Sequence, residues 1–165
     1  MAAGIITALC TWVAENGEMT VWDGEAHRYD AQGRSVGPEG SAGQSGWPVV
    51  KFTMPDKAAF RRKWNFEDTY HDEGIITCQI WHHTRELAEK TMDKIETLLA
   101  LYDNWAAIGR LIPSPYVENP HYVVQMLLES WSSVQEEGIR TMKSELIYKC
   151  ELIYMCFLHG AIPVA

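Results

Sequence analysis

The stretch from Gly74 to Tyr102 constrains the fold most, because its hydrophobic pattern changes from a period of two to a helical period with no further Gly or Pro. Its first part alternates between two faces, with Ile76, Cys78 and Ile80 on one and Thr77, Gln79 and Trp81 on the other. Such alternation is typical of a half-buried strand. From Leu87 onward, apolar residues recur at helical spacing, which predicts an amphipathic helix as far as Tyr102. Thr84 is the predicted N-cap of that helix.

The C-terminal third carries the clearest period-two pattern in the sequence. One apolar face is formed by Tyr122, Val124, Met126 and Leu128, and a second by Met142, Leu146, Tyr148, Cys150, Leu152, Tyr154, Cys156 and Leu158. Gln135–Gly138 contains the residues of a turn. The pattern therefore predicts a long C-terminal β-hairpin. Its second strand exceeds the usual ~5 to 6 residues, so we expect part of it to project beyond the sheet, where a neighbour can dock.

The N-terminal part predicts a helix, a strand pair and a further strand. Apolar residues at helical spacing predict a helix from Ala3 to Ala14, which stops at Asn16-Gly17. Met19–Tyr29 holds strand formers on both sides of Asp23-Gly24, a turn dipeptide, so it predicts a strand pair or an irregular arm. Trp47–Phe52 predicts a short strand that begins just after a proline.

Two connections interrupt these elements. Residues Ala31–Gly46 contain Gly33, Gly37, Gly40, Gly43 and Gly46, a composition too poor in apolar residues to offset its ordering entropy. This segment is predicted to be a flexible loop. Residues Asp103–Pro120 are predicted to form a long Pro-containing connection that is too apolar to be wholly exposed. At 165 residues the chain is predicted to be a single domain, residues 1–165. The predicted fold class is α+β, a mainly antiparallel sheet with helices packed on one face.

Composition limits the function. The net charge of -8 disfavours binding to nucleic acid through phosphate neutralisation, so protein partners are favoured. The four cysteines form no CxxC pair, which predicts reduced core residues and neither a zinc nor a redox motif. The apolar run at the N-terminus lacks a basic region before it, so no signal peptide is predicted. No apolar run reaches the ~18 residues of a membrane span, and we expect a protein assembled inside a cell.

No motif predicts an active site. His82-His83, together with His71, Asp72 or Glu73, is the first place to look for a metal. Adjacent residues at the end of a strand are, however, expected to point to opposite faces, and no third ligand stands at a recurring spacing. The carboxylate pairs Asp72-Glu73 and Glu136-Glu137 are predicted to be solvated charges in turns. The sequence lacks GxGxxG and GxxxxGK. Gly33–Gly37 (GRSVG) matches GxSxG, but it lies in the glycine-rich segment, without the strand and helix patterns that flank a nucleophile elbow. We therefore predict no catalytic, cofactor-binding or metal-binding residue, no cofactor, and no enzymatic activity.

The basic and aromatic residues within Lys57–Phe66 form the one such cluster in the sequence. It is interpreted either as a solvated turn with its aromatic side chains tucked inward or as a contact patch for an acidic neighbouring subunit. Large aromatic and arginine side chains are enriched at protein interfaces. The predicted subunit-interface residues are Trp22, Arg61, Arg62, Trp64, Trp105 and Trp131.

Five segments in this order carry a family resemblance. They are the helix from Ile5 to Val13, a glycine-rich gap, the strand WPVVKF, the segment DEGIITCQIWHHTRELAEKTMDKIETLL, and a closing hairpin that ends in ELIYKCELIYMCFL. This layout resembles the tail terminator, or tail completion, proteins of long-tailed bacteriophages and their prophages. A related neck or head-tail connector protein has the same features.

The resemblance implies a structural virion protein that assembles in the host cytoplasm into a ring, commonly a hexamer, at the head-proximal end of the tail tube. Such a ring ends tube polymerisation and contacts the tail tube protein and the head-completion proteins. DNA passes through it without sequence-specific binding, and no membrane is involved. Two alternatives remain: a small α+β enzyme or ligand-binding domain, and a host-directed accessory protein whose Lys57–Phe66 patch binds one partner.

Overall fold

The computed structural model describes residues 2–23, 27–29, 35–38, 48–54, 61–66, 69–112, 122–140 and 146–161. In chain order the elements are α1 (Ala2–Gly17), β1 (Val21–Asp23), β2 (His27–Tyr29), β3 (Ser35–Pro38), β4 (Val49–Thr53), β5 (Arg61–Phe66), β6 (Thr69–His82), α2 (Arg85–Leu99), α3 (Tyr102–Leu111), β7 (Tyr122–Trp131), β8 (Gln135–Arg140) and β9 (Leu146–Ala161). None of the helices in these ranges is long and apolar enough to cross a membrane.

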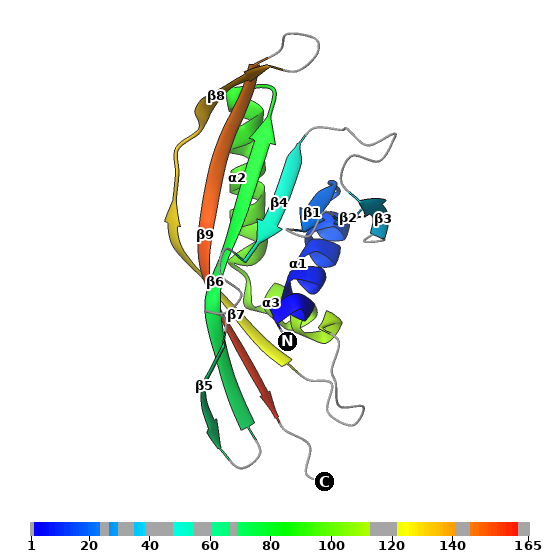
Figure 1. Cartoon of the computed structure of the whole chain (residues 1–165), viewed down its shortest axis with the longest axis vertical. Coiled ribbons are helices and arrows are strands. Elements are labelled where there is room, and N and C mark those ends of the chain that lie inside the picture. Colours follow the sequence, from blue (N-terminus) through cyan, green and yellow to red (C-terminus); the bar gives the residue numbers. More distant parts are fainter. Residues whose placement is uncertain are drawn as a thin grey trace.

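The centre of the sheet is a long antiparallel ribbon of β6 and β9, which runs vertically in Figure 1. All 14 residues of β6 pair with β9, from Thr69 opposite Ala161 to His82 opposite Tyr148. The strand order is β3-β2-β1-β4-β6-β9-β7, while β5 pairs with β6 and β8 pairs with β9 off this path. Only the β1–β4 pair is parallel among the pairs described. The predicted α+β class with a mainly antiparallel sheet is confirmed.

The ribbon is longer than its flanking strands, so each side of it holds two strands in succession. β4 pairs with the part of β6 from Thr77 to Trp81, and β5 pairs with the part from Thr69 to Glu73. On the other side, β8 and β7 divide β9 in the same way. The end of the ribbon that contains Thr69 therefore has the strand order β5–β6–β9–β7, with β5 and β7 at opposite edges (Figure 1).

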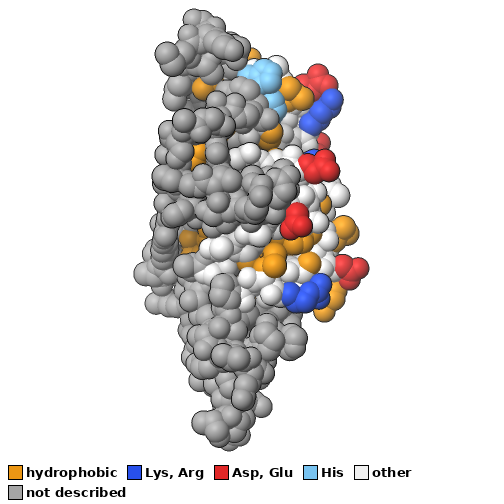
Figure 2. All heavy atoms as spheres, turned by 90° about the vertical axis from the view of Figure 1, so that its right-hand side faces the viewer, with side chains coloured by type: hydrophobic (Ala, Val, Ile, Leu, Met, Phe, Trp, Pro, Cys, Tyr) orange, Lys and Arg blue, Asp and Glu red, His pale blue; other side chains and the backbone are white. Residues whose placement is uncertain are grey.

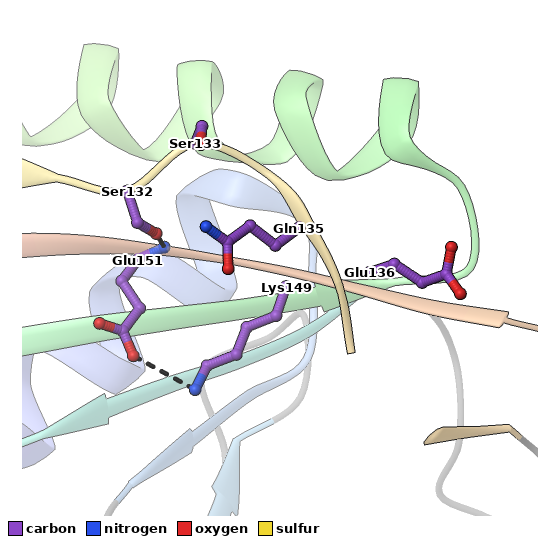
Figure 3. A pocket seen from close by; sticks show the side chains of 6 residues that line it. All are labelled: Ser132, Ser133, Gln135, Glu136, Lys149 and Glu151. Atoms are coloured by element: carbon purple, nitrogen blue, oxygen red, sulfur yellow. Dashed lines mark hydrogen bonds and ion pairs between the residues drawn. The ribbon is translucent and has the colours of Figure 1, made fainter. Parts of the chain in front are cut away.

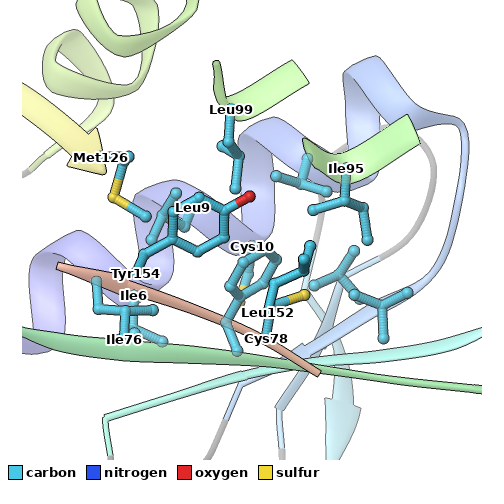
Figure 4. Close-up of a cluster of buried hydrophobic side chains, with 14 of the residues drawn as sticks. Ile6, Leu9, Cys10, Ile76, Cys78, Ile95, Leu99, Met126, Leu152 and Tyr154 are labelled. Carbon is cyan, nitrogen blue, oxygen red and sulfur yellow. The ribbon is translucent and has the colours of Figure 1, made fainter. Parts of the chain in front are cut away.

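The helices cover one face of this sheet. α2 packs on β6 and β9, α3 packs on β7, and α1 packs on β1, β4 and the other two helices. The strands send alternate residues into this layer, and along β9 these are Cys150, Leu152, Tyr154, Cys156 and Leu158. Figure 4 shows Leu152 and Tyr154 of β9 and Ile76 of β6 among side chains from α1 and α2. All four cysteines are buried and free, as predicted. Burial of this layer supplies the main stabilising free energy.

The helix after β6 begins as predicted. Thr84 has an extended backbone, and its hydroxyl accepts a hydrogen bond of 3.2 Å from the Leu87 N–H. Ala88, Thr91, Ile95 and Leu99 form the buried stripe. The helix ends at Leu99 instead of Tyr102, and a second helix, α3, follows. The prediction that residues 103–120 form a connection is therefore wrong from Asp103 to Leu111; residues 113–120 lie outside the described part of the chain.

Several residues predicted to form turns belong to strands. Gln135–Gly138 does not close the hairpin but forms part of β8, and the pairs Asp72-Glu73 and Glu136-Glu137 lie in β6 and β8. The reason is the length of the ribbon, which offers backbone hydrogen-bond partners well beyond its apolar centre. The hairpin itself exists, since β7 and β8 both pair antiparallel with β9. Arg61–Phe66 is likewise a strand, β5, and not a turn.

Two strand predictions in the N-terminal part are confirmed. The strand pair within Met19–Tyr29 is confirmed, with Val21 opposite Tyr29, and β4 confirms the strand predicted at Trp47–Phe52 from Val49 onward. Within the predicted loop 31–46, Ser35–Pro38 form β3 and pair with β2. The rest of that loop lies outside the described residues.

Candidate interaction surfaces

The face of the ribbon opposite the helices is polar near the start of α2. Trp81 of β6 lies between two lysines, with the Lys51 and Lys149 Nζ atoms 5.8 and 5.4 Å from its ring centroid. Lys149 Nζ is also 3.2 Å from a Glu151 carboxylate oxygen, Oε1, which accepts a hydrogen bond of 3.1 Å from Gln79 Nε2. The hydrogen bond from Gln79 and the interaction with Lys149 hold the pKa of Glu151 below its usual value, against the opposing effect of burial. Lys149 and Glu151 thus largely neutralise each other.

A polar hollow of about 310 Å³ lies beside Lys149 and Glu151, at the connection between β7 and β8. It is lined by Ser132, Ser133, Gln135, Glu136, Lys149 and Glu151 (Figure 3). The Glu151 N–H donates to Ser132 Oγ at 2.9 Å, and the Ser132 N–H donates to the Glu151 carbonyl at 3.0 Å. Ser132 thus continues the pairing with β9 across this connection. Since the Ser132 hydroxyl accepts from the backbone of β9, the arrangement is that of a strand junction.

The face of the ribbon opposite the helices, called the open face below, becomes apolar toward the Thr69 end of the ribbon. Ile75 of β6, Met155 of β9 and Leu127 of β7 lie side by side across three strands, and Ile153 and Phe157 of β9 share their face. Ile75 is 42% exposed, whereas its neighbour Ile76, on the helix-covered face, is completely buried. Apolar side chains that are exposed on this face, as Ile75 and Leu127 are, gain nothing from contact with water, and such a row is typical of a surface that another protein covers.

A second apolar surface lies on the helix side of the edge strand β7. Leu101, Tyr102 and Leu111, at the α2–α3 junction and along α3, are exposed, and Tyr102 is 69% exposed. Tyr102 meets Trp105 edge-on, with ring centroids 6.3 Å apart, and Trp105 Nε1 donates to the Leu99 carbonyl. Figure 2 shows hydrophobic side chains gathered at mid-height on the described part of this side of the molecule, with charged side chains around them.

An apolar hollow of about 230 Å³ opens between α3 and β7. Its lining is formed by Glu96, Leu99, Ala100, Trp105, Met126, Leu127, Leu128 and Tyr154. Tyr154 contributes an unusual group, because its hydroxyl is buried and has no hydrogen-bond partner among the described residues. Burial raises the pKa of this phenol, and Cys78 and Glu96 raise it further, so the hydroxyl stays protonated. A buried polar group without a partner is costly.

His82 and His83 are closer than the sequence predicts. Their Nδ1 atoms are 2.9 Å apart and their ring centroids 4.7 Å apart, so the expectation that they point to opposite faces is wrong. Strand alternation ends with β6 at His82, and His83 lies in the bend before Thr84. Burial, and secondly His83, lower the pKa of the His82 imidazole. The ranges described contain no group of three or more potential metal-ligating side chains.

The predicted interface residues divide into three groups. Trp22 is buried in β1, where its carbonyl accepts from the Cys10 thiol, so the prediction of an interface role is wrong for its indole. Trp131 is 67% exposed at the end of β7, and the half-buried Trp105 lines the apolar hollow. Arg61, Arg62 and Trp64 lie on β5, which pairs with β6 at the opposite edge of the sheet; their side chains lie outside the described part of the structure.

Sequence reasoning missed the other apolar residues of these surfaces. Ile75 and Leu127 occupy positions of a period-two pattern that face away from the core, and an apolar residue at such a position is the signal that could have found them. Leu101, Tyr102 and Leu111 were assigned to the wrong element. No family model matches the sequence, and no curated protein is similar to it.

Proposed function

We propose that this protein is a structural component of a long-tailed phage virion, forming a ring at the head-proximal end of the tail tube. The ring ends tube polymerisation and presents its other side to the head-completion proteins. The layout of the sequence supports this assignment, and so does the distribution of exposed apolar side chains.

The observation that carries the proposal is the pair of apolar surfaces at β7, one on each face of the sheet. Seven large hydrophobic side chains are exposed in the described part of the chain, and five of them, Leu101, Tyr102, Leu111, Leu127 and Trp131, lie on α3, at its start or on β7. Scattered exposed hydrophobic residues are normal, but a gathering of them beside an apolar hollow is typical of a protein interface. A subunit that must assemble needs such a surface.

The charge distribution fits a ring through which DNA passes. The chain carries a net charge of -8, and the exposed residues of α2 include four acidic side chains, Glu86, Glu89, Asp93 and Glu96, beside three basic ones, Arg85, Lys90 and Lys94. A chain of this net charge is not expected to bind phosphates through counterion release. DNA can therefore move past the protein without being held.

Native mass spectrometry of the purified chain, followed by electron microscopy of the chain mixed with tail tubes, tests the proposal. We expect a closed homo-oligomer, and rings at one end of each tube. A chain that stays monomeric with and without tubes contradicts it. Rings that bind a connector complex but never a tube end place the protein at another neck position.

A further inference from the structure

We propose that a second copy of this chain docks on α3, so that the two α3 helices pack antiparallel through their exposed faces in a reversible dimer. This inference goes beyond the proposed function. A contact between identical surfaces has twofold symmetry and closes at two copies, whereas the subunits of a ring on a tube end all share one orientation.

Four positions of α3 form one stripe on its exposed face. Asp103, Ala106, Ala107 and Arg110 stand at the spacings of three, four and seven residues that share one side of a helix. The two charged residues are exposed and the two alanines are half-buried, whereas Ile108 on the other side of the helix is buried. The exposed face of α3 therefore carries an acid near one end, a base near the other and small side chains between them.

The charges on this face fit a second copy. Antiparallel packing places Asp103 opposite Arg110 of the partner copy, and Arg110 opposite the partner's Asp103. The alanines of both copies meet at the crossing point, where small side chains allow a close approach of the helix axes. Within one copy the two charges are about 10 Å apart along the helix axis, and neither belongs to an ion pair found among the described residues. Complementary charge of this kind orients a contact.

Exposed apolar side chains flank the charged pair. Tyr102 precedes Asp103 and is 69% exposed, and Leu111 follows Arg110 and is 43% exposed. The same antiparallel packing places Tyr102 beside Leu111 of the partner copy at each end of the contact, which removes both from water. An acid in the first turn and a base in the last turn also suit the helix dipole. The dipole does not account for the apolar residues beside them, and a second copy accounts for both.

α3 is held in place on the rest of the subunit. Asn104 Nδ2 donates to the Leu98 carbonyl at 2.8 Å, and Trp105 Nε1 donates to the Leu99 carbonyl, so the start of α3 is tied to the end of α2. The other side of the helix packs on β7 and α1 (Figure 1). The exposed face is therefore positioned before a partner arrives, which lowers the entropy cost of docking.

The size of the face sets the strength of the dimer. A helix of 10 residues is about 15 Å long, so one α3 face covers far less than the ~800 Å² per partner of a stable interface. We therefore expect a dissociation constant in the micromolar range or weaker. Such a dimer separates readily and leaves the subunit free to join a ring.

Leu111→Gln tests the apolar part of the contact. We expect an unchanged melting temperature, because Leu111 is exposed, and a dissociation constant of the dimer that rises about tenfold, because the contact contains this residue twice. Sedimentation equilibrium of the full chain over a range of concentrations measures the dissociation constant. Leu87→Gln is the matched control, since Leu87 is also an exposed leucine but lies on α2. Equal dimerisation of Leu111→Gln and the wild type contradicts the contact.

A charge exchange tests the antiparallel pairing. We compare Asp103→Arg alone, Arg110→Asp alone, the two variants mixed in equal amounts, and one chain that carries both changes. Each single variant opposes like charges at both ends of the contact, whereas the mixture and the double variant restore opposite charges there. We expect each single variant to dimerise at least about fivefold more weakly, and the mixture and the double variant to return to within about twofold of the wild type. Circular dichroism checks the fold of each variant, and recovery by the double variant cannot come from the helix dipole, which both changes oppose.

The outcomes separate this contact from the proposed function. If the wild type forms no dimer, or if the double variant does not recover dimerisation, the contact is wrong and the ring is unaffected. If the single variants dimerise as the wild type does but no longer bind tail tubes, the α3 face serves the tube protein, which also overturns the inference. A dimer that responds as expected, in a chain that never forms rings on tail tubes, supports the contact and overturns the proposed function.

Discussion

The two faces of the β6–β9 ribbon are built from alternate residues of the same strands, yet they have different tasks. The face under the helices holds Ile76, Cys78 and Leu152, all completely buried. The other face changes along the ribbon from a row of paired charges around Trp81 to an apolar row that includes Ile75 and Met155. One face stabilises the subunit, and we infer that the other is available to partners. The neighbours Ile75 and Ile76, identical in chemistry and different in burial, make this comparison testable.

The largest effect is expected on the covered face. Ile76→Asp places a carboxylate in an apolar core with no partner, which costs more than about 4 kcal/mol and abolishes cooperative unfolding. Ile95→Asp on α2 should do the same, because Ile95 is completely buried against the same layer. Circular dichroism during thermal denaturation measures both. A native-like melting curve for either variant would show that the buried face has been assigned wrongly.

Ile75→Asp is the matched change on the open face. Since this side chain is 42% exposed, we expect the free energy of unfolding to change by less than about 1 kcal/mol. If the open apolar row is covered in the assembly, the same change weakens association by tenfold or more. Sedimentation velocity at several concentrations compares this variant with the wild type. Loss of folding together with loss of assembly would remove the distinction between the two faces.

The pH dependence of stability sharpens the comparison at the end of the ribbon, where His82 is buried. Its pKa is lowered below about 6.5, the value for an unfolded chain, so the unfolded state binds more protons around that pH. The free energy of unfolding should therefore fall as pH drops from about 7.5 through 6.5 towards the lowered pKa. Urea denaturation at pH 7.5 and 5.5 measures this loss. His82→Gln should make the loss smaller, and an unchanged slope would contradict the assignment.

Glu89→Ala should have the smallest effect. Glu89 is exposed on α2, away from both faces of the sheet, and surface substitutions of this kind change stability by about 0.5 kcal/mol or less. Thermal denaturation and native mass spectrometry should both match the wild type. A clear loss of assembly with unchanged melting temperature would extend the interface to the outer side of α2.

The sequence predicted the elements in which local pattern and tertiary environment agree. The alternation around Cys78 and along β9, the Thr84 cap and the buried stripe of α2 all appear at the expected positions. α3 was missed because it is short, contains Gly109 and precedes a segment with three prolines. Its helical state depends on packing against β7 and α1 more than on its own sequence.

The strands β5 and β8 were missed for a different reason. RRKWNF has no alternation, and QEEG in β8 has the composition of a turn. Both became strands because the long ribbon offers them unpaired backbone groups, and backbone pairing does not depend on side-chain pattern. The candidate surfaces were predicted only in part. Trp105 and Trp131 were found from their residue type, but Trp22 is buried although it lies beside Lys51 on the face opposite α1, and local pattern does not indicate that burial.

The central position of β9 affects how the chain folds. β9 pairs with β6, whose paired residues are more than 60 positions away in the sequence, as well as with β7 and β8. The middle of the sheet is therefore completed last in chain order. Bringing β9 to β6 closes a long loop, and this costs a large amount of chain entropy. During synthesis, β6 remains without this partner until β9 emerges from the ribosome, and its apolar residues are exposed to misassociation for that time. We expect slow refolding, and a yield that falls as protein concentration rises.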